Sequence, residues 1–402
     1  MNHMEHNHRA IVNAVREGTA LSRIDLSRSS NLSLATAKRV VDELLERGML
    51  EEGEALRGPG RGRKASALRL GSRYGFSVGA DVQPDSLRLT GLAFDGTVIY
   101  RRELSPDTDD RDSLQGLLVA ELRRALADSS AASRGSLLGI GVGIAGLVDA
   151  REGVVLYCPG LPGWENAPLA STLGECFGVE VLVDDAVRCM ALAEKRHGAA
   201  RGLGTFLYLY IGSGVGSGIV LDNRIYRGTN GVSGEFGHIT VKEDGPLCTC
   251  GNKGCLEAVV SARAILERAR ELVAAGVHST LGADTAGSPD QALSLEGIYQ
   301  AALRGDKLAT MLVAEAEESI GIGVADLINI FDPGTVVLAG EVIETFHGLI
   351  LEGIQKIVRR RALHVISQRT VIMKGAFETN IASLGAATLV IEQILGNEVL
   401  NL

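Results

Sequence analysis

The chain has 402 residues, of which 46% are hydrophobic, 22% charged and only 4% aromatic. This length predicts about two to four domains, each able to bury a core, and the apolar fraction excludes a disordered chain. The 50 glycines follow no Gly-X-Y period, which excludes collagen. A net charge of −9 argues against a protein that is basic throughout and binds nucleic acid over its whole surface.

Positive charge gathers at the start of the chain. Residues 1–75 carry 13 Lys and Arg against 9 Asp and Glu, and residues 76–402 carry 27 against 40. A basic segment on an acidic body is typical of a tethered DNA-binding module. We also expect a cytoplasmic protein without a membrane span. No apolar signal segment follows Met1–Arg9, the longest uncharged run contains six glycines, and six cysteines are too few for a disulfide scaffold.

The first 75 residues show the apolar spacing of three short helices. The second helix begins with a capping box at Ser22 and Asp25. The third begins at Ser33 and ends at Gly48, and only residues 30–32 separate it from the second, as in a helix-turn-helix. One apolar stripe of the third helix is expected to be buried: Ala37, Val40, Val41, Leu44 and Leu45.

The exposed N-terminal end of the third helix is where a recognition helix meets base edges. A basic glycine-rich stretch, residues 58–64, then lies between two short strands, 49–52 and 67–70, and resembles the wing of a winged helix. We therefore expect residues 1–75 to bind DNA. The alternatives are a small bundle packed on the body and a solvated linker. The expected DNA contacts are Ser33, Leu34, Thr36, Lys38, Arg39, Arg61, Arg63 and Lys64.

From residue 75 onward, strands alternate with helices, which indicates α/β architecture. The stretch 274–295, rich in Gly, Ser, Ala and Asp, is expected to be a loop or lid. Strands are predicted at 75–80, 87–94, 97–104, 138–144, 179–183, 206–211, 335–339 and 371–375. Helices are predicted at 111–129, 168–177, 186–197, 310–330, 344–361 and 381–395.

Three cysteines and a histidine lie close together in the sequence. His238 is followed, after nine intervening residues, by Cys248, Cys250 and Cys255. Three thiolates and one imidazole supply the closed tetrahedral shell of structural zinc, and four protein ligands leave no open position for a catalytic water. The alternative, three reduced thiols beside an unrelated histidine, fits the dense spacing poorly. We predict a structural Zn²⁺ site.

Four motifs together resemble the ROK family of repressors and sugar kinases. They are Ile-Ala-Gly-Leu-Val-Asp at 144–149, Pro-Gly-Trp at 162–164, Gly-Glu-Phe-Gly-His at 234–238, and the cysteine segment 248–257. The resemblance covers essentially the whole chain, because repressors of this family also carry an N-terminal winged helix-turn-helix. It implies an α/β fold with an actin-like (ribonuclease H-like), two-lobed body and a sugar site in the cleft between the lobes. The expected domains are the DNA-binding domain 1–75, a first lobe 76–195 on which the C-terminal helix 380–402 packs, and a second lobe 196–379 with the zinc loop.

The first phosphate loop separates the kinases of this family from its repressors. In the kinases the loop is Asp-x-Gly-Gly-Thr-Lys, whose backbone amides hold the ATP phosphates. Here residues 81–86 are Asp-Val-Gln-Pro-Asp-Ser. Pro84 has no N–H to donate, and Asp85 would bring negative charge close to a phosphate. We expect this loop to have lost its function.

Two further segments of the nucleotide site give conflicting indications about ATP binding. The glycine-rich loop 212–218 still matches the family, although a hairpin that needs glycine at positive φ would give the same pattern. The segment 339–342 has lost part of the family's glycine triplet, and Glu341 would crowd or repel a nucleotide. The balance favours a body that keeps the fold and does not turn over ATP.

The sugar site is better preserved. By motif matching, Asp185 holds the place of the kinase general base, and Glu235, His238 and Glu257 match other sugar-contacting positions of the family. His238 could bind zinc through one ring nitrogen and the ligand through the other. The alternative for Glu235 and Glu257 is support of the zinc loop. Asp184 stands where the family has an amide, which allows a preferred ligand other than a glucose-like sugar.

These observations predict a transcriptional regulator of carbohydrate metabolism that binds operator DNA as a homodimer or dimer of dimers. We expect a repressor, and the sequence leaves an activator open. A sugar or sugar phosphate would act as the inducer and contact Asp184, Asp185, Glu235, His238 and Glu257. Two alternatives remain open. One is an ATP-dependent sugar kinase, and the other is a sugar-binding protein that acts without DNA.

Overall fold

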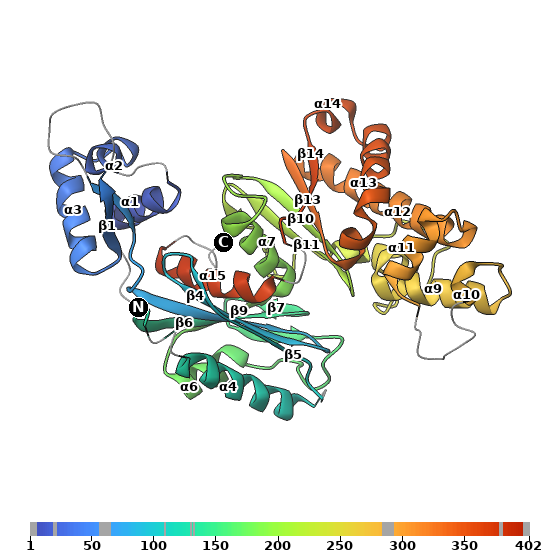
Figure 1. Ribbon diagram of the computed structural model, residues 1–402, viewed down its shortest axis with the longest axis horizontal. Coiled ribbons are helices and arrows are strands. Elements are labelled where there is room, and N and C mark those ends of the chain that lie inside the picture. Colours follow the sequence, from blue (N-terminus) through green and yellow to red (C-terminus); the bar gives the residue numbers. More distant parts are fainter. Residues whose placement is uncertain are drawn as a thin grey trace. The chain divides into compact units, whose positions relative to one another are not determined.

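The computed structural model describes residues 6–18, 22–55, 66–107, 110–128, 131, 133–283, 293–377 and 381–396 (Figure 1). The chain divides into two compact units. Unit 1 comprises residues 1–193, 229–231 and 381–402, and unit 2 comprises residues 194–228 and 232–380. Among the described residues, no helix is both long enough and apolar enough to cross a membrane.

Unit 1 begins with a helix-turn-helix followed by a two-stranded hairpin. The predicted caps are confirmed: the side chains of Ser22 and Ser33 each accept a backbone N–H from the first turn of their helix, and Gly48 ends the third helix at a φ of 70°. The two strands pair antiparallel, as the predicted wing requires. The elements are α1 (His6–Arg16), α2 (Arg23–Ser29), α3 (Leu34–Glu46), β1 (Leu50–Ala55) and β2 (Ser66–Leu70).

The rest of unit 1 is built on a five-stranded sheet in the order β5-β4-β3-β6-β9. The first three strands are an antiparallel meander, and β6 and β9 are parallel to β3. Helices α4 and α6 cover one face of the sheet, and α15 covers the other (Figure 1). The bounds are β3 (Gly75–Val82), β4 (Leu87–Ala93), β5 (Val98–Leu104), α4 (Arg111–Ala127), β6 (Ser136–Ile144), β7 (Leu147–Asp149), β8 (Val154–Tyr157), α6 (Leu169–Phe177), β9 (Val181–Asp185), α7 (Ala186–His197) and α15 (Ala382–Ile394).

The last helix, α15, lies directly on the backbone of this sheet. A Cβ atom at Gly79 would lie 1.9 Å from the carbonyl oxygen of Ser383, and one at Gly141 would lie 1.9 Å from that of Ala386. No side chain larger than hydrogen fits at either position. All of the helix from 382 to 392 is buried as a result. The glycines in β3 and β6 thus explain why α15 packs so close to the sheet.

Unit 2 repeats the same sheet order, β12-β11-β10-β13-β14, with the same mixture of antiparallel and parallel pairs. Its core joins β10 and β13 to the long helices α12 and α13. This repetition confirms the predicted actin-like α/β body. The bounds are β10 (Phe206–Ile211), β11 (Val215–Leu221), β12 (Arg224–Ile225), α8 (Leu256–Val260), α9 (Ala262–Ala274), α10 (Thr280–Ala283), α11 (Leu295–Leu303), α12 (Lys307–Phe331), β13 (Thr335–Ala339), α13 (Glu341–Arg361), α14 (His364–Ser367) and β14 (Val371–Lys374).

Two local predictions were wrong. The expected loop at 274–295 contains the short helix α10, whose start is held by Asp306: its carboxylate accepts the N–H of Thr280 at 2.7 Å. Residues 284–292 of that stretch lie outside the described part of the chain. Strand β9 also runs past its predicted end at 183, because Asp184 and Asp185 still pair with β6. A local composition does not reveal such partners, which come from distant parts of the chain.

Candidate metal centre and ligand-binding residues

The four predicted metal ligands come together in unit 2. One ring nitrogen of His238 and the Sγ atoms of Cys248, Cys250 and Cys255 all lie within 4.8 Å of one another. Cys248 Sγ is 3.6 Å from His238 Nδ1, and Cys250 Sγ is 3.7 Å from Cys255 Sγ. Two sulfurs bound to one tetrahedral zinc at about 2.3 Å would be about 3.8 Å apart. The donor set and its spacing therefore fit a metal ion.

The backbone of the cysteine loop is shaped to hold this cluster. The N–H of Cys248 donates to the carbonyl oxygen of Asn252 at 2.7 Å, which closes a tight turn. Gly254 has a φ of 68°, and a Cβ there would lie 1.6 Å from the carbonyl oxygen of Lys242, so only glycine fits. A backbone hydrogen bond from Asn252 lowers the pKa of the Cys250 thiol, which favours the thiolate that binds metals.

The second ring nitrogen of His238 faces a carboxylate. His238 Nε2 lies 3.9 Å from Glu235 Oε2, whereas Nδ1 faces Cys248. The imidazole is 35% exposed and the Glu235 side chain 51% exposed. The ring can thus serve the metal cluster with one nitrogen and meet a carboxylate or a bound molecule with the other.

Glu257 ties the metal loop to the glycine-rich loop. It lies in the first turn of α8, directly after Cys255, and its Oε2 accepts the N–H of Val215 at 3.0 Å. Val215 opens β11, immediately after the turn between β10 and β11. The Glu257 carboxylate therefore positions one segment of the expected nucleotide site from the metal side.

The glycines of the loop at 212–218 have a steric cause. None of its four glycines has a positive φ, so the expectation of a hairpin that needs that conformation was wrong. A Cβ at Gly212 would instead lie 2.5 Å from the hydroxyl of Tyr210, and one at Gly214 would lie 3.2 Å from Glu257 Oε2. Close neighbours, and not backbone torsion, explain these two glycines.

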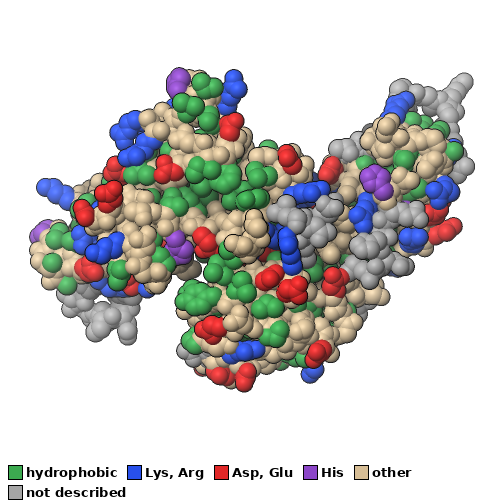
Figure 2. Space-filling model, turned by 180° about the vertical axis from the view of Figure 1, so that it is seen from behind, with side chains coloured by type: hydrophobic (Ala, Val, Ile, Leu, Met, Phe, Trp, Pro, Cys, Tyr) green, Lys and Arg blue, Asp and Glu red, His purple; other side chains and the backbone are tan. Residues whose placement is uncertain are grey.

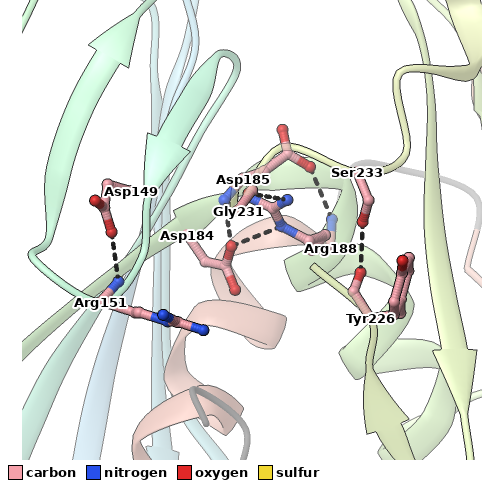
Figure 3. Close-up of polar contacts among 8 residues, drawn as sticks. All are labelled: Asp149, Arg151, Asp184, Asp185, Arg188, Tyr226, Gly231 and Ser233. Carbon is pink, nitrogen blue, oxygen red and sulfur yellow. Dashed lines mark hydrogen bonds and ion pairs between the residues drawn. The ribbon is translucent and has the colours of Figure 1, made fainter. Parts of the chain in front are cut away.

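Asp184, Asp185 and Arg188 form a compact cluster at the end of β9 in unit 1 (Figure 3). Asp184 Oδ1 accepts the Nε–H of Arg188 at 2.8 Å, and both side chains are only 3% exposed. Arg188 also donates to the carbonyl oxygen of Gly231 at 2.9 Å. Asp185 accepts the backbone N–H of Arg188 at 3.0 Å and is half-buried. Asp184 is thus engaged inside the protein, whereas Asp185 reaches the surface.

The structure groups the expected ligand contacts by unit. Asp184 and Asp185 lie together in unit 1, and Glu235, His238 and Glu257 belong to unit 2. The sequence analysis missed Arg188, although an acid followed four residues later by arginine at a helix start is a recognisable pattern. It also missed the use of Glu257 as a backbone acceptor, which no local pattern announces.

Asp81, the first residue of the altered phosphate loop, is completely buried. The side-chain amide of Gln83 donates to its Oδ1 at 2.7 Å, and Arg88 Nη1 lies 3.6 Å from its Oδ2. The ring of Pro84 occupies the space next to Gly160, since a Cβ there would lie 2.3 Å from the Pro84 Cγ. The chain's own side chains therefore occupy the surroundings of this carboxylate.

The burial of Asp81 predicts a specific pH dependence of stability. Burial raises its pKa from the ordinary 3.8 to about 6, although the Gln83 hydrogen bond and the Arg88 charge lower it. The native state therefore binds the proton more tightly than the unfolded chain, and stability falls as pH rises from about 4 to about 6, by on the order of 3 kcal/mol. We expect Asp81→Asn to exceed the wild type in urea stability at pH 7 and to match it near pH 4. The exposed Asp107→Asn variant is the control, and parallel pH profiles for Asp81→Asn and wild type would contradict the burial argument.

The predicted recognition helix presents its polar face to solvent. Leu34, Lys38 and Arg39 are exposed, and Arg39 forms an i,i+4 ion pair with Glu43. The hydroxyls of Ser33 and Thr36 are 2.8 Å apart. In Figure 2 several Lys and Arg side chains mark this part of the chain, at the upper right. The wing residues Arg61, Arg63 and Lys64 lie outside the described residues.

The family model described as the ROK family matches residues 79–393. The chain belongs to the ROK family. It is 30% identical to a xylose repressor of Caldicellulosiruptor bescii over 394 residues, 96% of this chain and 95% of the relative. A crystal structure of a ROK family transcriptional regulator, a homologue of the Escherichia coli MLC protein, superposes with a TM-score of 0.84 at 27% identity and covers 98% of this chain and 97% of its own.

A ROK kinase matches a smaller share of the chain than the regulators do. A Streptomyces griseus ROK glucokinase, solved with glucose and AMPPNP, superposes with a TM-score of 0.65 at 28% identity. The superposition covers 99% of the glucokinase chain but only 78% of this chain. The regulators therefore match this ROK protein over 96–98% of its length, and the glucokinase over 78%.

Proposed function

We propose that this ROK protein is a sugar-responsive transcriptional repressor. The observation that carries the proposal is its similarity over 96% of its length to a xylose repressor, with a helix-turn-helix and wing hairpin at the expected place. Operator DNA would contact the exposed end of α3 and the wing. A sugar or sugar phosphate would bind the body near Asp185, Glu235, His238 and Glu257, with Asp184 and Arg188 holding Asp185 in place.

The proposed division of the chain follows the same logic. Residues 1–75 bind DNA, residues 76–195 with the C-terminal helix 380–402 form the first lobe, and residues 196–379 form the second lobe. A homodimer or dimer of dimers would place two recognition helices on a palindromic operator. Ligand binding would change the arrangement of the lobes and weaken DNA binding, because two half-sites require a defined separation.

The metal centre is proposed to hold structural Zn²⁺ through His238, Cys248, Cys250 and Cys255. A bound zinc would lock the loop that carries His238 and Glu257. His238 would then present Nε2 to the ligand in a fixed orientation. The four protein ligands complete a tetrahedron, so the site is assigned no part in catalysis.

Fluorescence anisotropy with the protein's own upstream DNA tests the proposed function. We expect nanomolar binding at physiological salt, a clear preference over a scrambled duplex, and release by one member of a sugar panel that includes D-xylose. Equal and steeply salt-dependent binding to both duplexes would show only attraction to phosphates and would contradict the proposal.

Lys38 offers a sharper test of the recognition helix. Its exposed ammonium is placed to contact a phosphate or a guanine edge. If it contacts a phosphate, Lys38→Ala should weaken binding to all sequences alike and reduce the slope of log K against log salt by about one for each lysine in contact. Lys356→Ala, an exposed lysine on α13 of unit 2, is the control. An unchanged affinity and salt slope for Lys38→Ala would remove Lys38 from the interface.

Sugar phosphorylation is the second candidate function, and the retained glycine-rich loop 212–218 favours it. The Gln83, Pro84 and Arg88 side chains around Asp81 oppose it. We expect no ADP formation from ATP and Mg²⁺ with any sugar of the same panel. ADP formation with one of these sugars would support the kinase function and contradict this expectation.

A further inference from the structure

The first helix of the chain contacts the last one. Arg16, at the end of α1, forms an ion pair with Glu392 of α15, and Arg16 Nη1 and Glu392 Oε1 are 2.5 Å apart. Arg9, about two turns earlier in α1, donates to the carbonyl oxygen of Gly396 at 3.4 Å. Residues separated by 376 positions in the sequence thus join the helix-turn-helix to the body within unit 1.

Glu392 has a fixed place on the body. Its side chain is 1% exposed, and the helix that carries it packs backbone to backbone on the sheet. The hydroxyl of Ser77 in β3 also donates to the carbonyl oxygen of Ala387 at 2.8 Å. A carboxylate so deeply buried needs a charged partner, and Arg16 of the helix-turn-helix supplies one. The ion pair therefore joins a rigid part of the body to α1.

Around Arg16, the junction between the helix-turn-helix and the body contains an open cavity. This cavity of about 390 Å³ lies beside Arg16, between the helix-turn-helix with its wing hairpin and the body. Most of the charged side chains around this cavity form ion pairs with residues on the same side of it. Arg69 pairs with Glu51 inside the wing hairpin, and Arg134 pairs with Asp95 on the body. Arg16 lines the same cavity but reaches across to α15. The cavity is lined by Val15, Arg16, Glu51, Leu68, Arg69, Leu70, Ser72 and Asp95.

We propose that Arg16 and Glu392 are positioning residues that hold the DNA-binding helices at one orientation on the body and thereby set the spacing between operator half-sites. The inference rests on the proposed function, since it concerns how a dimer reads DNA. Each base pair added between two half-sites turns one of them by about 34° and moves it by about 3.4 Å. A DNA-binding domain held by a buried ion pair cannot follow this displacement without breaking the pair. A domain released from the pair can turn with the DNA.

Operator duplexes with zero, one, two and five added base pairs at the centre test this inference in the full-length protein. We expect the wild type to lose at least about tenfold in affinity at one of these spacings, and Arg16→Gln to lose less than about threefold at the same spacing. Arg16→Lys keeps the charge and should regain part of the discrimination. Arg69→Gln is the matched control, because Arg69 lines the same cavity but pairs only within the wing hairpin.

Hydrogen exchange without DNA supplies a second readout. Peptides from α1 and from the end of α15 should exchange faster in Arg16→Gln than in the wild type, and the Arg69→Gln control should leave α15 unchanged. Wild-type-like spacing discrimination in Arg16→Gln would overturn the positioning role, and unchanged exchange would show that the ion pair does not hold the two helices together. A wild type that does not prefer its own operator over scrambled DNA would overturn the proposed function itself. These failures are therefore distinguishable.

Discussion

Replacement of Cys248 by serine is expected to abolish metal binding and to destabilise unit 2 severely. Cys248 is buried and lies 3.6 Å from His238 Nδ1, so its loss opens the tetrahedral donor set. Structural zinc sites contribute apparent binding free energies of about 10–16 kcal/mol in small zinc-dependent folds, which is comparable with the whole stability of a domain. We expect about one zinc per wild-type chain by elemental analysis, almost none in Cys248→Ser, and a fall of many degrees in the unfolding temperature.

Cys248→Ser should also impair the proposed ligand site. His238 and Glu257 flank the metal loop, and Glu257 holds the N–H of Val215. Without the metal we expect loss of the sugar response as well as loss of stability. Cys176→Ser is the control, because Cys176 is exposed on α6 in unit 1 and should keep both metal and response. Wild-type protein purified without metal, or Cys248→Ser with a full complement, would contradict the structural-zinc assignment.

Replacement of Arg188 by alanine is expected to cost about 3–5 kcal/mol in the free energy of unfolding, because it removes the guanidinium that pairs with the buried Asp184 carboxylate. The Asp184→Asn/Arg188→Met double variant removes both charges and should recover much of that loss. Chemical unfolding of Asp184→Asn, Arg188→Met and the double variant gives the coupling energy directly.

An ion pair on the surface serves as the control for the buried Arg188–Asp184 pair. Arg268 and Glu271 lie 3.4 Å apart with both side chains more than half exposed, so Arg268→Ala should change the free energy of unfolding by less than about 1 kcal/mol. If Arg188→Ala proved equally mild, Asp184 would not depend on Arg188 in the way the structure implies. We also expect Arg188→Ala to weaken sugar binding, because the Arg188 guanidinium holds Asp184 Oδ1, which in turn accepts the backbone N–H of Asp185.

Much of the fold could be predicted where a single local property decides the structure. The caps at Ser22 and Ser33 act within one helical turn, and both were identified correctly. Strands β10 and β13 and helix α7 were predicted with their exact bounds. Each strand is a short, almost continuous apolar run between glycines, and Gly198 follows the helix. Helix α10 was missed, because its anchor Asp306 lies 26 residues further along the chain than Thr280.

The candidate site divides in the same way. The four metal ligands come from two short segments, so their chemistry and spacing were visible in the sequence. The environment of Asp184 was not visible in the sequence. Its place in a motif predicted a ligand contact, but its side chain is buried against Arg188. Whether a carboxylate faces solvent or a guanidinium depends on packing, and packing was not encoded in the motif.

The sequence by itself determined the donor set at His238 and the cysteines, the winged helix-turn-helix and the altered phosphate loop, because each depends on residues that are close in the chain. The tertiary structure alone decided which charges are buried and with what. It placed Gln83 and Arg88 around Asp81, and it joined Arg16 to Glu392 across 376 positions. The physical reason is that burial and ion pairing depend on distance in space, and a sequence pattern reports only distance along the chain.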